Sequence, residues 1–319
     1  DPYRARRGSC PNAGCRSMNL QKDWLVIFCL ALGVCISNAF ARFAYGLILP
    51  AMQSDLGWNY TQAGWINTAN ALGYVAGALL TFTLIGRIKA PTLFIVGLLV
   101  TSLSLLAVGF SSGFWPLTFW RIVAGVAGAP VFIAGGAMAA SLFPDDPRKN
   151  ALAIAAYFGG GGLGMLLSGA VLPGLFEVRG LSVWPFAWIG LGLASFLMSP
   201  CSIWAARQVN LTAKTTAKDV PLPIKPMIFA LSGYGLFATG YIVYITFIVA
   251  WMRALDTSAS MVSISWILIG VGIIASPFIW KPVLARFASG LPLALACAVT
   301  GLATLIPVLL PSMLGLLMS

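Results

Sequence analysis

The sequence contains no histidine and very few acidic residues. Its 319 residues include 8 Asp and Glu together, and only 8% of all residues are charged. Histidine is the commonest general base and metal ligand, so its absence argues against imidazole-dependent chemistry. All the acids lie outside the long apolar segments or at their edges, which disfavours a membrane-embedded enzyme with a buried acid, base or metal ligand. We therefore expect a protein that is not an enzyme and that has no catalytic, metal-binding or cofactor-binding residues.

Apolar residues dominate what is present. They make up 59% of the chain, and the mean hydropathy is +0.92, which is typical of a protein whose solvent is lipid. A helix that crosses a bilayer needs about 20 apolar residues. The sequence predicts an all-α polytopic membrane protein with nine such spans, at 24–49, 62–85, 91–110, 115–143, 151–173, 183–205, 226–252, 260–280 and 291–310. A tenth begins at Pro311, and the sequence ends within it at Ser319.

The positive charges indicate an orientation rather than a nucleic-acid partner. The net charge is +11, but the charged residues occupy the short breaks between apolar runs. Of the 19 Lys and Arg, fifteen fall before the first span or in the loops that would share its starting side. Because cytoplasmic loops are enriched in Lys and Arg, we predict a cytoplasmic N-terminus and a bacterial inner-membrane location. The expected partners are the lipid bilayer and a small-molecule substrate, with no nucleic acid.

The N-terminal region permits two interpretations. Arg-rich residues followed by Ala39-Phe40-Ala41 resemble a signal peptide with its cleavage site, but the apolar run continues to Pro50, which favours an uncleaved first span. Residues 1–17 differ from the rest, and Met18 opens a segment typical of a natural start. We interpret 1–17 as a non-native or disordered extension.

A weak internal repeat suggests two halves. The longest cytoplasmic loop, 207–225, separates the six spans of 18–206 from the remainder, 226–319. A shift of 201 residues pairs Asp55 with Asp256 and Trp65-Ile66 with Trp266-Ile267. This pattern favours two six-helix halves related by a parallel repeat, of which the second is incomplete here.

Two arginines lie within predicted spans, Arg42 and Arg121. An arginine at a helix centre costs about 2.5–3.5 kcal/mol on insertion scales, so each needs a reason to be there. Neither has an acid nearby in the spans, so a substrate carboxylate or phosphate could supply the counter-ion. For Arg121, bonding to backbone carbonyls as a structural brace is the main alternative, whereas Arg42 is the better candidate for substrate binding.

Polar residues that recur at helical spacing are the other candidates for a substrate site. Asn38 and Tyr45 are predicted to share a face with Arg42, and Asn67, Asn70 and Tyr74 to share a face of the second span. Such faces should contact protein or water rather than lipid, either as hydrogen bonds between helices or as a cavity lining. The seventh span adds three tyrosines on one face, Tyr234, Tyr241 and Tyr244.

Gly159, Gly161 and Gly164 fit the GxGxxG dinucleotide fingerprint, but they lie in the middle of a predicted span. That fingerprint requires a preceding strand, so we interpret these glycines, like Gly73 and Gly77, as sites of close helix packing.

The segment RFAYGLILPAMQSDLGWNYTQAGWINTANALGYVAGALL (42–80) strongly resembles the start of the YbfB/YjiJ-type branch of the major facilitator superfamily. RIVAGVAGAP (121–130) and GYGLFATGYIVYITF (233–247) resemble its fourth and seventh helices. LIGRIKAP (84–91) departs from the superfamily, because it keeps Arg87 and Lys89 but lacks the usual acid.

The resemblance implies a major facilitator fold of two six-helix halves, truncated here to nine helices and part of a tenth. It also implies a monomeric secondary transporter that moves a small solute by alternating access, and it names no substrate. From the unpaired arginines we predict an organic anion. The alternative is a non-transporting membrane sensor or scaffold with a transporter-like fold.

Overall fold

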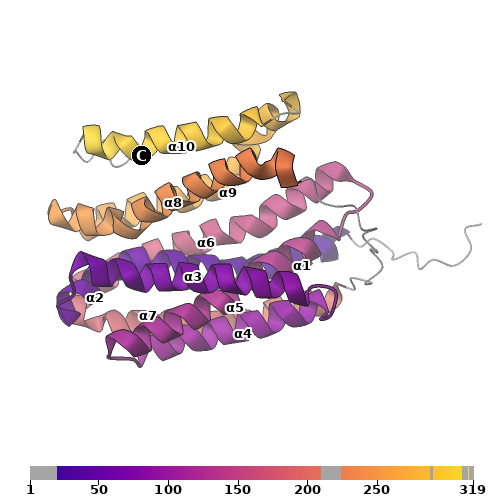
Figure 1. Ribbon diagram of the computed structural model, residues 1–319. Coiled ribbons are helices and arrows are strands. Elements are labelled where there is room, and N and C mark those ends of the chain that lie inside the picture. Colours follow the sequence, from indigo (N-terminus) through magenta and orange to yellow (C-terminus); the bar gives the residue numbers. More distant parts are fainter. Residues whose placement is uncertain (1–19, 210–223, 288–289, 311–314, 316–319) are drawn as a thin grey trace, which may run out of the picture.

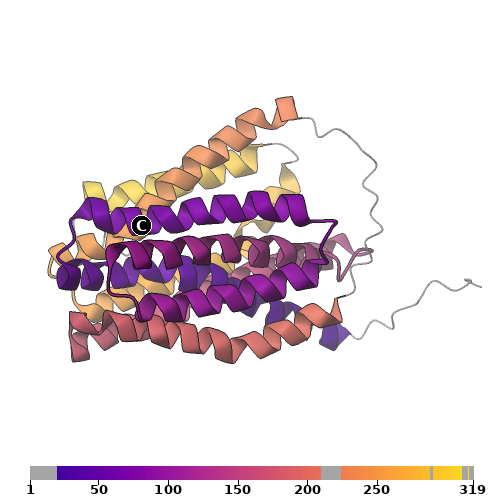
Figure 2. The ribbon, with the colours of Figure 1, turned by 60° about the horizontal axis from the view of Figure 1, so that its bottom comes forward.

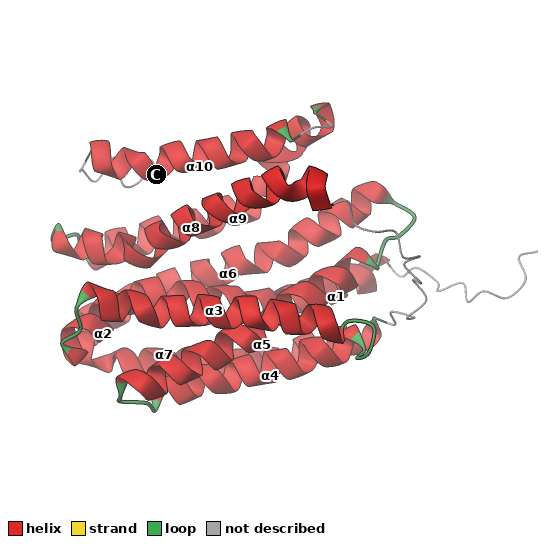
Figure 3. Cartoon of the chain, viewed as in Figure 1, coloured by secondary structure: helices red, strands yellow, loops and turns green. Residues whose placement is uncertain are grey.

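The computed structural model describes residues 20–209, 224–287, 290–310 and 315, and within them every regular element is a helix (Figures 1 and 3). The first continuous helix comprises α1 (Leu20–Val34), the π-helix η1 (Cys35–Phe43) and α2 (Ala44–Leu56). The others are α3 (Tyr60–Leu84), α4 (Ala90–Gly109), α5 (Phe114–Ala140), α6 (Pro147–Arg179), η2 (Leu181–Val183) with α7 (Trp184–Gln208), α8 (Ile224–Ala254), α9 (Ala259–Arg286) and α10 (Leu291–Leu309).

All nine predicted spans are therefore confirmed as helices. The extension 1–17, most of the loop 207–225 and most of the predicted tenth span lie outside the described residues. Eight of the helices are long and apolar enough to cross a membrane. The exception is α3, which has 25 residues, but its asparagines, threonines, glutamine and tyrosines dilute its apolar character. A spanning helix with this composition belongs where protein, not lipid, surrounds its polar face.

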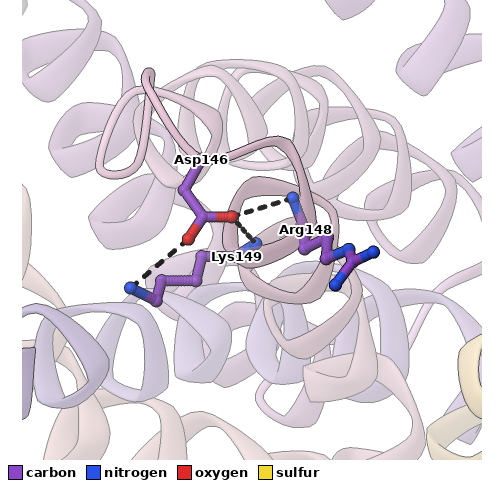
Figure 4. A network of polar contacts seen from close by, with 3 residues as sticks. All are labelled: Asp146, Arg148 and Lys149. Atoms are coloured by element: carbon purple, nitrogen blue, oxygen red, sulfur yellow. Dashed lines mark hydrogen bonds and ion pairs between the residues drawn. The ribbon is translucent and has the colours of Figure 1, made fainter.

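Local sequence signals account for the ends of several helices. Asn59 and Gln62 form a reciprocal capping box at the start of α3, with hydrogen bonds of 2.8 and 3.1 Å. At the start of α6, the Asp146 carboxylate accepts hydrogen bonds from the backbone N–H groups of Arg148 and Lys149, each 3.1 Å long, and pairs with the Lys149 ammonium at 3.3 Å (Figure 4). These contacts, led by the Lys149 N–H, lower the pKa of Asp146.

Glycines bring α3 and α5 into backbone contact. A Cβ added at Gly73 would collide with the carbonyl of Ile122, one at Gly77 with that of Val126, and one at Gly125 with that of Asn70. Small residues permit this approach where lipid provides no hydrophobic drive between helices. The predicted packing role of Gly73 and Gly77 is confirmed.

The glycine-rich segment of α6 packs on two neighbours. Gly160 and Gly164 face α1 and η1, whereas Gly162 and Gly169 face α9, at Gly270 and Trp266. Packing is thus confirmed for Gly164. Gly161 is also buried, in ordinary contact with Val34 of α1 at 3.8 Å from the position of a Cβ, whereas the prediction is wrong for Gly159, which has no described atom within 4 Å of that position.

The first six spans meet α8 mainly at one end of the bundle. Gly46 of α2 lies against the carbonyl of Ile245, the ring of Tyr60 packs on Phe247 with centroids 6.3 Å apart, and Asn67 donates a 2.6 Å hydrogen bond to Thr246. Residues 227–240, toward the opposite end of α8, are all exposed or half-buried. Figure 2 shows the start of α8, where the grey trace joins it, farther from α3 than its end. α8 thus contacts α2 and α3 near the α2–α3 turn and separates from α3 toward its own start.

Candidate functional site

The π-helix η1 decides how the polar residues of the first span are presented. Its wider turn, with i→i+5 hydrogen bonds, shifts the faces of the helix relative to α-helical spacing. Asn38 and Arg42 lie on a half-buried face, but Tyr45 is fully buried on another. The prediction that Tyr45 shares a face with Asn38 and Arg42 is therefore wrong, because it assumed a regular α-helix through 35–43.

Tyr45 instead helps to enclose Arg121. Its hydroxyl donates a 2.7 Å hydrogen bond to the carbonyl of Ala63, and its ring lies 6.5 Å from that of Trp188. The Arg121 guanidinium is 5.0 Å from the Tyr45 ring centroid and 5.2 Å from that of Trp188. Two aromatic faces therefore supply cation–π attraction to a desolvated cation.

Arg121 is fully buried, with 0% of its surface exposed. It donates to the carbonyl oxygen of Ala41, in η1, and to Oδ1 of Asn67, 3.4 Å away. These contacts join α5 to the first span and to α3, which is the geometry of a structural brace.

Asn70 is also buried within the bundle. Its Nδ2 donates a 2.9 Å hydrogen bond to the backbone carbonyl of Arg121. Asn67, Asn70 and Tyr74, predicted to share a face, have partly shared partners. Asn67 and Asn70 both bond to Arg121 of α5, Asn67 also donates to Thr246 of α8, and Tyr74 lies under Arg42.

Arg42 has a different environment from Arg121. Its guanidinium carbon lies 5.1 Å from the centroid of the Tyr74 ring, and it forms no hydrogen bond or ion pair with the residues that the structure describes. Its Nε is buried without a partner, as is Oδ1 of Asn38, one helical turn earlier. A donor and an acceptor are thus left unmatched on the same face of η1.

Two groups of aromatic side chains lie near Asn38 and Arg42. On one side the rings of Tyr74, Phe132 and Phe158 follow one another, with centroid separations of 6.3 and 4.7 Å. On the other, along α8, Tyr241 and Tyr234 flank Phe237 at 5.3 and 6.0 Å. Tyr74 and Tyr241 are close enough to Arg42 to interact with it electrostatically.

The three predicted tyrosines of α8 differ in their surroundings. Tyr241 is half-buried near Arg42, and Tyr234 is 55% exposed and lies near Tyr241. Tyr241 and Tyr244 line two adjoining grooves between α8 and α10, of about 250 and 210 Å³, which share Thr304. Phe132 and Phe158 were not predicted for this site, since an aromatic residue in an apolar helix carries no sequence signal that separates a cavity wall from the core.

The arrangement suits recognition of a carboxylate or another oxyanion. A guanidinium presents a planar fork of donors, and the Asn38 amide adds a donor and an acceptor beside it. In the described part of the chain, no group of three or more Cys, Asp and Glu residues could hold a metal ion.

Comparison with known proteins gives a consistent family. A family model described as "Uncharacterised MFS-type transporter YbfB" matches residues 30–319. A chloramphenicol resistance protein of Streptomyces lividans is 29% identical over 183 residues, which cover 57% of this chain and 43% of that protein. A hexuronate transporter of Bacillus subtilis (strain 168) is 26% identical over 288 residues, which cover 81% of this chain and 64% of that protein. The chain thus spans about two fifths to two thirds of these relatives. With eight helices long and apolar enough to cross a membrane in its described part and a family match over most of its length, the chain belongs to the YbfB-type family of major facilitator transporters.

Proposed function

We propose that this chain belongs to a secondary transporter that moves a small organic anion across the bacterial inner membrane by alternating access. In this proposal Arg42 binds the anionic group. The observation that carries it is a contrast in the terminal guanidinium nitrogens: those of Arg121 donate to Ala41 and Asn67, whereas Arg42 has no hydrogen-bond acceptor among the described residues, although Nε is unmatched in both arginines.

The energetics support a ligand at Arg42. An arginine in a membrane helix costs about 2.5–3.5 kcal/mol, and a cation–π contact with Tyr74 returns roughly 0.5–2 kcal/mol of that. A bidentate carboxylate would add charge-assisted hydrogen bonds, each worth about 1.5–3 kcal/mol. A bound anion would therefore offset the remaining free-energy cost of Arg42 in the membrane, which the described protein groups offset only in part.

The aromatic side chains support an organic rather than an inorganic anion. Tyr74, Phe132 and Phe158 on one side and Tyr241 on the other offer ring faces within reach of a group attached to the carboxylate. Ring faces pack against apolar or ring-shaped parts of a ligand, and Arg42 would orient the ligand through its anionic group. We infer that Asn38, Arg42, Tyr74, Tyr234 and Tyr241 contact the substrate, and that Tyr45, Asn70 and Arg121 support them.

The conformation supports alternating access. α8 contacts α2 and α3 near the α2–α3 turn and separates from α3 toward its own start, as one state of such a cycle requires. The distribution of Lys and Arg favours a cytoplasmic location for the separated end, so we infer an inward-facing state with the N-terminus in the cytoplasm. We further propose that the transporter acts as a monomer.

The relatives agree on transport more than on substrate. A hexuronate is a sugar acid that carries a carboxylate, which fits a guanidinium, whereas chloramphenicol is neutral. No observation in the described residues favours the alternative of a non-transporting sensor or scaffold.

Binding to the purified chain tests the proposal. We expect organic acids, including a hexuronate, to raise its unfolding temperature in detergent, while their methyl esters and amides do not. A shift produced equally by an acid and by its neutral ester would refute recognition of the anion. Substrate-free protein in matched salt controls for ionic strength.

A further inference from the structure

A second site faces lipid rather than the interior. An apolar groove of about 300 Å³ runs between α3, α4 and α5 in the half of the bundle where α1 begins. Leu80 and Val96 form its rims and are 50% and 55% exposed. Because these rims belong to membrane-spanning helices, the groove opens toward acyl chains.

Small residues produce the depth of this groove. Gly77 of α3 and Gly97 of α4 lie directly against the backbone carbonyls of Val126 and Ala127 in α5, so the floor has almost no side-chain bulk. Thr81 adds no free polar group there, since its hydroxyl donates a 2.7 Å hydrogen bond to the Gly77 carbonyl. The floor is thus apolar and shaped to take a chain of methylene groups.

Two cations stand at one end of the groove. The turn between α3 and α4 is tight, with Gly86 at φ +93° and the N–H of Ile88 bonded to the Leu84 carbonyl at 3.0 Å. Ile88 and Leu84 line the groove, and Arg87 and Lys89 flank Ile88. Both cations are exposed, and neither forms an ion pair with a residue that the structure describes.

We propose that this groove binds an anionic phospholipid, with one acyl chain between α3, α4 and α5 and its phosphate at Arg87 and Lys89. The cations stand at one end of the apolar groove, as the phosphate of a lipid stands at one end of its acyl chain. The charge distribution assigns this end to the cytoplasmic leaflet, where anionic lipids concentrate, and each Lys or Arg near that surface strengthens binding roughly fivefold. The site does not include Arg42, so a test of lipid binding does not depend on the transport proposal.

Native mass spectrometry of the delipidated chain, titrated with dioleoyl phosphatidylglycerol or dioleoyl phosphatidylcholine, tests this assignment. We expect the anionic lipid to bind roughly 25-fold more tightly, from two cations at about fivefold each. Arg87→Gln with Lys89→Gln should abolish that preference but leave the weak binding of phosphatidylcholine. The matched control, Arg148→Gln with Arg207→Gln, removes two exposed cations elsewhere at the same end and should keep the preference.

A second variant tests the acyl-chain seat. Val96→Phe should fill the groove and weaken both lipids at least tenfold, while Val75→Phe, on an exposed part of α3 outside the groove, should not. Unliganded unfolding temperatures should match the wild type. The proposal is overturned if Val96→Phe binds both lipids normally, if the paired glutamines keep the preference, or if soluble glycerol phosphate competes as well as the lipid.

Discussion

Arg42 and Arg121 occupy neighbouring regions of the bundle, yet the protein treats them in opposite ways. Around Arg121, two aromatic rings, a backbone carbonyl and an asparagine enclose the cation completely. Around Arg42, the Tyr74 ring is the one direct contact among the residues that the structure describes, and the side chain stays half-buried. The difference teaches that an intramembrane arginine does not by itself indicate a binding site. What distinguishes the two roles is whether protein groups accept hydrogen bonds from the terminal guanidinium nitrogens, since Nε is unmatched in both arginines.

Substitution of Arg121 should have the largest effect. Arg121→Ala removes two cation–π contacts and the link between α5 and η1 and leaves a cavity, so we expect the free energy of unfolding to fall by about 3–5 kcal/mol. Thermal unfolding in detergent measures this. Arg121→Lys keeps the cation and should lose less. A stable Arg121→Ala protein with impaired ligand binding would reverse the roles that we assign.

Substitution of Arg42 should affect binding rather than folding. We expect Arg42→Ala to weaken an organic acid that binds the wild type roughly 10- to 100-fold, because a charge-assisted hydrogen bond of about 1.5–3 kcal/mol is lost. Calorimetric titration measures this, and the unfolding temperature should not fall. Arg42→Lys keeps the charge without the planar fork, so its affinity for the acid should lie between those of the wild type and Arg42→Ala. Unchanged affinity with reduced stability would make Arg42 a second brace.

The Tyr74 ring should matter less than either arginine. Tyr74→Leu removes the cation–π contact that orients Arg42, so we expect affinity for the same acid to fall roughly twofold to fivefold, from about 0.5–1 kcal/mol. The same titration measures it. Tyr74→Phe keeps the ring and serves as the matched control. If the two variants lose affinity equally, the hydroxyl and not the ring face is responsible.

Asn70 should give the smallest change, and only in stability. Asn70→Ala removes one hydrogen bond between α3 and α5, which in membrane bundles is worth about 0.6–1.7 kcal/mol. Thermal unfolding should show this loss without any change in ligand affinity. A loss of affinity at unchanged stability would return Asn70 to the binding site that the sequence predicted for it.

Much of the architecture could be predicted because it follows from local properties. Apolar run length defines each of the nine helices, and Asn59 and Asp146 mark the starts of two of them through bonds to their own backbone. Glycine spacing predicted close packing at Gly73, Gly77 and Gly164, since an absent side chain acts wherever two helices meet. The placement of Arg42 and Arg121 in membrane helices follows from the same hydropathy.

The candidate site depended on features that sequence spacing does not contain. The π-helix at Cys35–Phe43 turned Tyr45 away from Arg42, and no residue in that segment marks it as other than α-helical. Phe132 and Phe158 reached the site only through the packing of α5 and α6.

The sequence by itself determined that this chain enters a membrane, where each of the described helices lies and which charges those helices carry, because hydropathy and chain length act residue by residue. Only the tertiary structure decided which arginine is enclosed. That outcome depends on where Tyr45, Trp188, Asn67 and the Ala41 carbonyl, from three different spans, come together in space.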